Sequence, residues 1–180
     1  MDIATYAGIK KQLIERGFAN EIEWAENIKP VSKPLDFFCE YAYVIVNSGM
    51  KNQIARKIWD KIVQALREDK QVSAVFRHSG KAKAIQDAWL NHKEMFDAYQ
   101  AAGDKLQYLD QLPFIGPITK MHLAKNLGME VCKPDRHLVR IAKSFGMTPE
   151  ELCLKLSKES GDRIVTVDTV IWRAANLGML

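Results

Sequence analysis

The chain has 180 residues, of which 47% are hydrophobic and 27% charged, a composition typical of one soluble domain with its own core. That composition excludes disordered, collagen-like and disulfide-rich proteins. The net charge of +4 permits a nucleic-acid partner without requiring one.

Apolar residues recur at spacings of three and four far more often than two, which predicts an all-α fold of about ten short helices. Tyr41–Val46 has a strand-like composition, but it lies inside a longer helical pattern and has no partner strand nearby, so we predict a buried helix. A helix is expected to begin near Asn52, with Trp59, Ile62, Val63 and Leu66 on one face. A second is expected over 81–102, and a shorter third contains Leu106, Leu109 and Leu112.

The second half of the chain begins with a helix–turn–helix pattern. One helix is predicted to end at Leu112, and the next to open at about Pro117 after a turn with two prolines and a glycine. Later helices are expected over Arg136 to Phe145, after the N-cap pattern Thr148-Pro-Glu-Glu, and, buried, over Ile164–Val170.

The start of the helix at Pro117 has the properties of an anion site. Its first amides have no partner within the helix and carry the positive end of the helix dipole, and Gly116 lets the backbone approach a ligand. Thr119, Lys120 and Lys125 are candidates for additional contacts to a phosphodiester. An ordinary connection in an all-α core is the alternative.

A single acid, Asp135, follows in Lys133-Pro134-Asp135, directly before the helix that starts at Arg136. Most aspartates in such places are N-caps. Six Lys or Arg residues lie between Lys120 and Lys143, against the two acids Glu130 and Asp135.

Together these two segments resemble the helix–hairpin–helix DNA glycosylase superfamily. The family's hairpin reads like L-P-G-[IV]-G-x-x-T-A, and a Gly/Pro-rich loop about twenty residues later carries the catalytic aspartate in a context like D-x-H-[ILV]-x-R. Here the hairpin is Leu112-Pro-Phe-Ile-Gly-Pro-Ile-Thr119, and the aspartate context is Asp135-Arg-His-Leu-Val-Arg140. The close match covers 112–142, and a looser similarity runs from Pro34 to the end.

The resemblance implies two helical lobes that flank a DNA-binding cleft, with Asp135 meeting the hairpin in that cleft. One lobe spans about 34–128, as a six-helix barrel with the hairpin over 105–128, and the other spans about 1–33 plus 134–180. All 180 residues then form one glycosylase domain.

Two departures from the family pattern bear on geometry and mechanism. Phe114 replaces the first hairpin glycine, so the turn must avoid a left-handed conformation there or reach it with strain. Ile118 occupies the place of the Schiff-base lysine found in members that also nick the strand. Lys120 lies two positions on and points elsewhere around the helix, so we interpret it as a phosphate contact or surface residue. Asp168, in Val167-Asp-Thr-Val-Ile-Trp-Arg173, resembles the aspartate motif superficially and is interpreted as a structural acid.

The resemblance also places DNA-contacting groups elsewhere in the chain, because a flipped base requires phosphate anchors, a wedge and a pocket. The segment Asn47-Ser-Gly-Met-Lys-Asn-Gln-Ile-Ala-Arg56 occupies the place of the family's wedge, with Lys51 and Asn52 as the wedge candidates and Arg56 facing the opposite strand. An ordinary turn between two helices is the alternative. His137 is expected to point toward the hairpin or the backbone. The candidate DNA contacts are Phe114, Gly116, Ile118, Thr119, Lys120, Lys51, Asn52, Arg56 and His137, and the candidate pocket residues are Phe114, Ile118, Met121, Trp24, Phe37, Phe38 and Tyr41.

We expect no resident metal or organic cofactor. The four histidines show no ligand spacing, and the three cysteines Cys39, Cys132 and Cys153 are too few and too widely spaced for an iron–sulfur cluster or a disulfide framework. In the family a monovalent cation often bridges the hairpin backbone and a phosphate. The sequence shows no signal peptide or membrane span, which favours a cytoplasmic, nucleoid-associated protein.

The predicted function is hydrolysis of the N-glycosidic bond of a damaged or modified base in double-stranded DNA, by a monomeric, monofunctional glycosylase. One alternative is a bifunctional glycosylase and lyase for oxidised purines such as 8-oxoguanine, with Lys120 or another lysine as nucleophile. The other is a structure-specific DNA-binding protein without catalytic activity.

Overall fold

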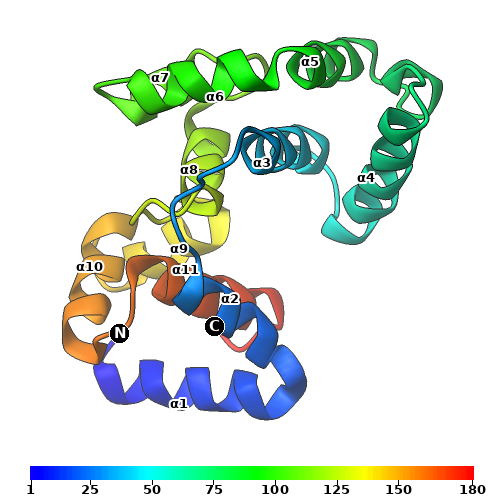
Figure 1. Ribbon diagram of the computed structural model, residues 1–180. Helices are drawn as coiled ribbons and strands as arrows, with labels where there is room; N and C mark the ends of the chain where they lie inside the picture. The colour runs from blue at the N-terminus through cyan, green and yellow to red at the C-terminus, as the bar shows by residue number, and fades with distance from the viewer. The chain divides into compact units, whose positions relative to one another are not determined.

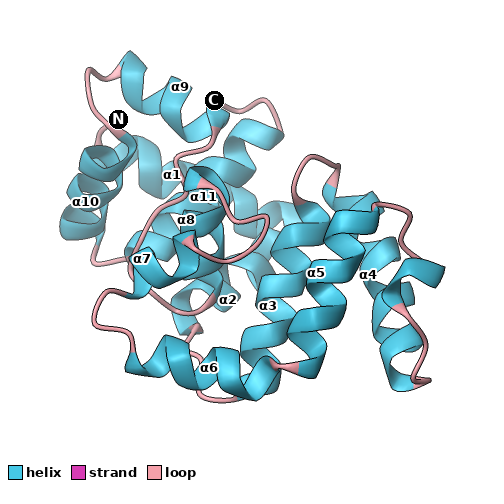
Figure 2. Ribbon diagram, turned by 90° about the horizontal axis from the view of Figure 1, so that it is seen from above, coloured by secondary structure: helices cyan, strands magenta, loops and turns pink.

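The computed structural model describes all 180 residues and is entirely helical, with no strand, which confirms the all-α prediction (Figures 1 and 2). The chain divides into two compact units. Unit 1 contains Met1–Pro30 and Ala124–Leu180, and unit 2 contains Val31–Leu123. The lobes expected from the sequence were 1–33 with 134–180 and 34–128.

The helices follow one another through short connections. Unit 1 contains α1 (Ile3–Leu13), the π turn η1 (Ile14–Phe18), α2 (Ala19–Asn27), α9 (Arg136–Ser144), α10 (Pro149–Ser160) and α11 (Ile164–Asn176). Unit 2 contains α3 (Pro34–Asn47), α4 (Asn52–Arg67), the 3-10 turn η2 (Val72–Ala74), α5 (Ser79–Leu90), α6 (His92–Ala101) and α7 (Lys105–Asp110). Helix α8 (Pro117–Asn126) begins in unit 2 and ends in unit 1.

Unit 1 is built around α11, which packs against α1, α2, α9 and α10. Every residue from Val165 to Ile171 is buried, so α11 is covered on almost all sides. Strand-favouring Val, Ile and Thr fit this helix because complete burial compensates their weak helix propensity. The prediction of a buried helix here is confirmed.

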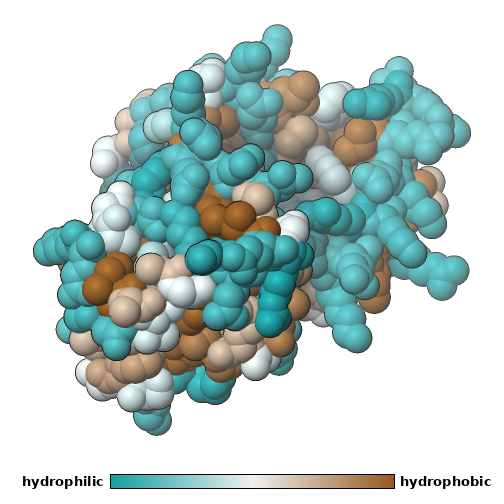
Figure 3. All heavy atoms as spheres, turned by 90° about the horizontal axis from the view of Figure 1, so that it is seen from below, coloured by the Kyte–Doolittle hydropathy of each residue, from teal (hydrophilic) through white to brown (hydrophobic).

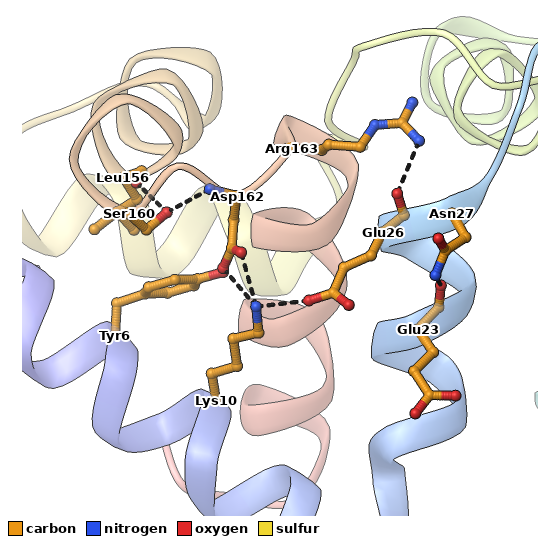
Figure 4. Close-up of polar contacts among 9 residues, drawn as sticks. All are labelled: Tyr6, Lys10, Glu23, Glu26, Asn27, Leu156, Ser160, Asp162 and Arg163. Atoms are coloured by element: carbon orange, nitrogen blue, oxygen red, sulfur yellow. Dashed lines mark hydrogen bonds and ion pairs between the residues drawn. The ribbon is translucent and has the colours of Figure 1, made fainter.

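A polar network joins α1 and α2 to the loop between α10 and α11 (Figure 4). The buried Tyr6 hydroxyl donates to Asp162 Oδ2 at 2.6 Å, and Lys10 Nζ donates to Asp162 Oδ1 at 2.7 Å and to Glu26 Oε1 at 2.7 Å. Burial, together with the bond to Asp162, raises the pKa of Tyr6, so its hydroxyl remains a donor. Two carboxylates, Asp162 and Glu26, thereby hold together segments far apart in sequence.

We expect Tyr6→Phe to lower the free energy of unfolding by about 1–3 kcal/mol, because it removes one donor from a part-buried carboxylate. Urea denaturation measures the change. Lys11→Gln, on the exposed side of α1, is the matched control and is expected to have little effect. Equal stability of Tyr6→Phe and the wild type would contradict a stabilising role for the network.

Unit 2 has the same plan around α3, which packs against α4, α5 and α6. Its inner face is aromatic and aliphatic, with Phe37, Phe38, Tyr41 and Ile45 buried. Tyr41–Val46 is therefore helical and buried, as predicted. Phe38 meets Trp89 edge to face at 5.3 Å between ring centroids, and Phe37 meets Tyr99 at 5.0 Å.

One predicted element is wrong: 81–102 forms two helices, α5 and α6, that meet at Asn91. The Asn91 side chain donates to the carbonyl of Asp87 at 2.7 Å and so competes with the backbone for the last turn of α5. Other boundaries agree closely. α4 begins at Asn52, α8 begins at Pro117, and Thr148 starts α10 with a complete capping box.

None of the helices combines the length and the apolar character that a membrane-spanning segment requires. On the face shown in Figure 3, hydrophilic residues predominate and apolar residues reach the surface in small groups. Two of the exposed apolar side chains, Phe114 and Ile118, belong to the segment that the sequence marks as a candidate site.

Candidate functional site

The segment between α7 and α8 forms a tight loop in unit 2, over 111–116. Helix α7 ends at Asp110, two residues before the predicted end. Ile115 is buried and its N–H donates to the carbonyl of Leu112 at 3.1 Å. The Tyr41 hydroxyl donates to the carbonyl of Pro113 at 3.0 Å, which ties the loop to α3. Burial raises the pKa of Tyr41, so the phenol keeps its proton and remains a donor.

Phe114 takes the strained alternative of the two conformations expected at its position. Its φ is +62°, in the left-handed region that favours glycine. A bulky side chain there costs about 1–3 kcal/mol, which the surrounding contacts must offset. The side chain is 44% exposed, so burial of the ring recovers only part of this cost.

The N-terminus of α8 leaves two backbone donors for a ligand. Lys120 N makes the first helical bond, to Gly116 O at 2.8 Å, and Pro117 has no N–H. The N–H groups of Ile118 and Thr119 therefore precede the first backbone bond of the helix. These two amides, with the helix dipole, are the groups that the predicted anion site requires, and anion binding there stays a prediction.

Gly116 and Thr119, two of the predicted contacts at this terminus, are bonded to each other. The Gly116 N–H donates to Thr119 Oγ1 at 2.7 Å, and the same hydroxyl donates to Gly116 O at 3.1 Å. Gly116 and Thr119 thus bond to each other and shape the start of α8, and the Thr119 side chain is not free for a phosphate. Ile118 stays 50% exposed.

The lysines of α8 are also occupied. Lys120 Nζ lies 3.1 Å from Asp110 Oδ1, an ion pair that joins α8 to the end of α7. Lys125 Nζ lies 2.5 Å from Asp168 Oδ2 and is mostly buried in unit 1. The expected phosphate role of Lys125 is therefore wrong, and the ammonium of Lys120 is paired with Asp110.

In the segment expected to supply a wedge, Lys51 is exposed in the α3–α4 loop and Arg56 is exposed in the first part of α4. Asn52 is half-buried and its Oδ1 accepts a bond from the Tyr43 hydroxyl at 2.5 Å, so it helps to begin α4. The predicted wedge role of Asn52 is thus in conflict with a structural one. Lys81 Nζ donates to the carbonyl of Ser48 at 2.7 Å and anchors this loop to α5.

The start of α5 lies against the α7–α8 loop, which the sequence does not indicate. A Cβ added to Gly80 would come 2.9 Å from Cζ of Phe114, so the Phe114 ring covers that glycine. The His78 ring meets Phe114 edge to face, with centroids 5.8 Å apart and planes at 86°. The sequence pattern marks Ser79 and Gly80 only as a helix boundary. The one other signal in the sequence that could have pointed to this segment is the positive charge of the neighbouring Arg77 and Lys81.

The predicted pocket residues differ in their exposure. Phe37, Phe38 and Tyr41 are buried in the core of unit 2, where they hold α3 against its neighbours. Trp24 is 42% exposed on α2 of unit 1. Met121 is half-buried on α8. Aromatic residues at helical spacing here belong mainly to the core, so Phe37, Phe38 and Tyr41 are corrected to structural roles.

Asp135, the predicted catalytic acid, lies in unit 1 and is the N-cap of α9. Its Oδ1 accepts the N–H of His137 at 2.9 Å and the N–H of Leu138 at 3.1 Å. Oδ2 takes part in neither bond. His137 therefore orients the carboxylate through its backbone, and its ring is half-buried.

The loop that carries Asp135 is fixed to α11. Asp135 N donates to the carbonyl of Lys133 at 2.7 Å, which folds the chain tightly around Pro134. Asp168, 2% exposed, accepts the Lys133 N–H at 3.4 Å as well as the Lys125 ammonium. The interpretation of Asp168 as a structural acid is confirmed.

The side chain of Lys133 adds a second amine to this region. Burial lowers its pKa, the nearby charge of Lys125 lowers it further, and the carboxylates of Asp135 and Asp168 oppose the shift. The amine and the candidate catalytic acid are thus electrostatically coupled.

No group of three or more His, Cys, Asp or Glu side chains is placed to hold a metal ion. A monovalent cation at the α7–α8 loop would use backbone carbonyls. Leu112 O and Pro113 O each accept one hydrogen bond, from Ile115 and Tyr41, and keep a second lone pair, whereas Gly116 O accepts from both the Lys120 N–H and the Thr119 hydroxyl. The cation therefore remains a prediction.

Comparisons with protein-family models, with curated proteins and with solved structures found no match for the chain. Functional inference therefore depends on the residues themselves.

The Asp168–Lys125 pair gives the first test of this region. Asp168→Asn leaves the Lys125 ammonium buried without a counter-charge, since the two side chains are only 3% and 12% exposed. We expect a loss of about 3–5 kcal/mol in unfolding free energy, and recovery of most of it when Asp168→Leu is combined with Lys125→Met. Chemical denaturation of single and double variants measures this. A loss of less than about 1 kcal/mol in the single variant would contradict a buried pair.

The pKa of Lys133 gives a prediction for pH. Because its folded-state pKa is lowered, the buried ammonium destabilises the fold at neutral pH, and the cost disappears as pH rises toward the unfolded-state pKa of 10.5. Lys133→Met should therefore raise the unfolding midpoint at pH 7 and by less at pH 10. Lys143→Met, at an exposed position on α9, is the matched control. A gain of the same size at both pH values would show that the amine is not desolvated.

Proposed function

We propose that this protein is a monofunctional DNA glycosylase that hydrolyses the N-glycosidic bond of a damaged or modified base, with Asp135 as its catalytic carboxylate. The observation that carries the proposal is the hydrogen bonding of that carboxylate. Two backbone N–H groups of α9 orient Oδ1, and Oδ2 takes part in neither bond. The motif Asp135-Arg-His-Leu-Val-Arg140 supplies the family context.

The reaction suits a single oriented carboxylate. As the bond between C1′ and the base nitrogen breaks, positive charge develops on the deoxyribose, and a fixed anion next to the sugar stabilises it. Asp135 Oδ2 orients a water molecule and accepts a proton as the oxygen bonds to C1′. The base leaves with the electron pair of the broken bond and takes up a proton. One acid suffices because the nucleobase is the leaving group.

Unit 2 supplies the features expected of a DNA-binding element. The Ile118 and Thr119 amides at the start of α8 suit a phosphate, and Ile118 and Phe114 are exposed beside them. Lys51 and Arg56 are exposed near the α3–α4 loop and are proposed as further contacts. The proposed substrate is double-stranded DNA, bound by a monomer across the expected cleft, in a cytoplasmic, nucleoid-associated protein.

The test is base release from a panel of duplexes that carry oxidised, alkylated, deaminated or hypermodified bases, detected by mass spectrometry. Asp135→Asn is expected to lower the release rate at least about 100-fold, because it removes the proton acceptor and the charge. Asn is as good an N-cap as Asp, so stability should stay nearly unchanged. Asp2→Asn, which alters the N-cap of α1 in the same unit, is the matched control and should release bases at the wild-type rate.

The outcomes separate the alternatives. Absence of base release by the wild type, together with normal DNA affinity, would reject the enzyme and leave a DNA-binding protein. A borohydride-trapped covalent adduct with abasic DNA, lost in Lys120→Ala, would reject the monofunctional mechanism in favour of a lyase. Full release by Asp135→Asn would reject Asp135 as the catalytic residue.

A further inference from the structure

Phe114 combines strain with exposure. Its backbone has a φ of +62°, a conformation that glycine adopts without cost, yet the chain places an aromatic residue there and leaves 44% of it exposed. An aromatic side chain would be expected at this position if it filled the core, and a glycine would be expected if only the turn mattered. Neither explanation accounts for an exposed Phe, and strain of this kind is typical of functional positions.

The ring is held in place from one side. Gly80 has no side chain where a Cβ would lie 2.9 Å from Phe114 Cζ, so this glycine makes room for the ring. No left-handed φ accompanies Gly80, and its role is therefore spatial. The His78 ring supports Phe114 edge to face, at 5.8 Å. Only part of the aromatic surface is used by these contacts.

The surroundings favour a nucleic-acid ligand for the remaining surface. Phe114 lies two residues before Gly116 and the start of α8, whose Ile118 and Thr119 amides precede the first helical bond. The segment that supports the ring also carries Arg77, which is exposed, whereas Lys81 is bonded to the carbonyl of Ser48. An exposed aromatic ring, two helix-terminal amides and an exposed arginine in adjoining segments are the components of a single-strand stacking platform.

We propose that Phe114 stacks on a nucleobase of the DNA strand whose phosphate is bound at the N-terminus of α8. The proposal rests on the proposed function, in that DNA is the ligand. A ring fixed by Gly80 and His78 loses little conformational freedom on binding, and every base offers a π-face to it. A glycine in the same turn would keep the backbone geometry and lose the stacking contact.

The experiment compares Phe114→Gly, Phe114→Trp and the wild type on a duplex that contains a tetrahydrofuran abasic site with 2-aminopurine next to it. Phe114→Gly is expected to weaken binding about 10-fold and to abolish the stacking-dependent quenching of 2-aminopurine fluorescence. Its thermal stability should equal or exceed that of the wild type, because the strain is relieved. Phe114→Trp should retain both affinity and quenching.

Phe145→Ala is the matched control, because this phenylalanine is 43% exposed but lies in unit 1 at the end of α9. It should bind as the wild type does. The dependence of affinity on salt should be unchanged in Phe114→Gly, since no charge is removed, and a shallower dependence would indicate lost phosphate contacts and contradict stacking. Wild-type affinity and quenching in Phe114→Gly would also overturn the proposal.

Failure of the two proposals can be told apart. If Phe114→Gly binds as the wild type and still releases a base, only the stacking role fails. If the wild type releases no base but Phe114→Gly loses affinity, the glycosylase fails and stacking stands. A wild-type protein that does not bind DNA overturns the stacking role as well.

Discussion

Burial of Val165–Ile171 in α11 is the constraint on which unit 1 depends. This part of the helix has no exposed side for a charged residue, yet Asp168 lies within it. Such a carboxylate needs compensation, and Lys125 supplies a counter-charge while the Lys133 N–H supplies a hydrogen bond. The hydrogen bond from the Lys133 N–H to Asp168 fixes the chain immediately before Pro134 and Asp135. The position of the candidate catalytic acid thus follows from the need to satisfy one buried charge in the core.

Unit 2 relates its core to its surface in a similar way. Tyr41 lies on the buried face of α3, but its hydroxyl reaches the carbonyl of Pro113 and holds the turn that precedes Phe114. The strained φ of Phe114 then directs its ring over Gly80. Tyr41, which the sequence suggested as a pocket wall, therefore helps to set the shape of the loop from within the core.

Local pattern predicts the helices better than it predicts their meeting points. The long 3.6-residue periodicity around Tyr41–Val46 and Ile164–Val170 outweighed their β-branched composition, and the burial of both helices explains why. The chain turns at Asn91, where the side chain and the N–H both bond to the Asp87 carbonyl, and periodicity does not register this break. The approach of Gly80 to Phe114 depends on tertiary packing between residues more than thirty positions apart. Likewise, Lys125 belongs by sequence to a cationic cluster and by packing to the core.

Capping and catalysis are compatible roles for Asp135, although the sequence presents them as alternatives. A carboxylate has two oxygens with about four lone-pair directions, and the cap of α9 engages only Oδ1. The cap bonds restrict rotation of the carboxyl group, which is a requirement for a group that must meet a reacting atom within a narrow range of positions. Sequence statistics alone favour the cap because most aspartates before helices do nothing more. What distinguishes Asp135 from the other aspartate N-caps of this chain, Asp2 and Asp104, is that its loop is bonded to a buried ion pair. The same region that begins a helix therefore also places a half-buried carboxylate.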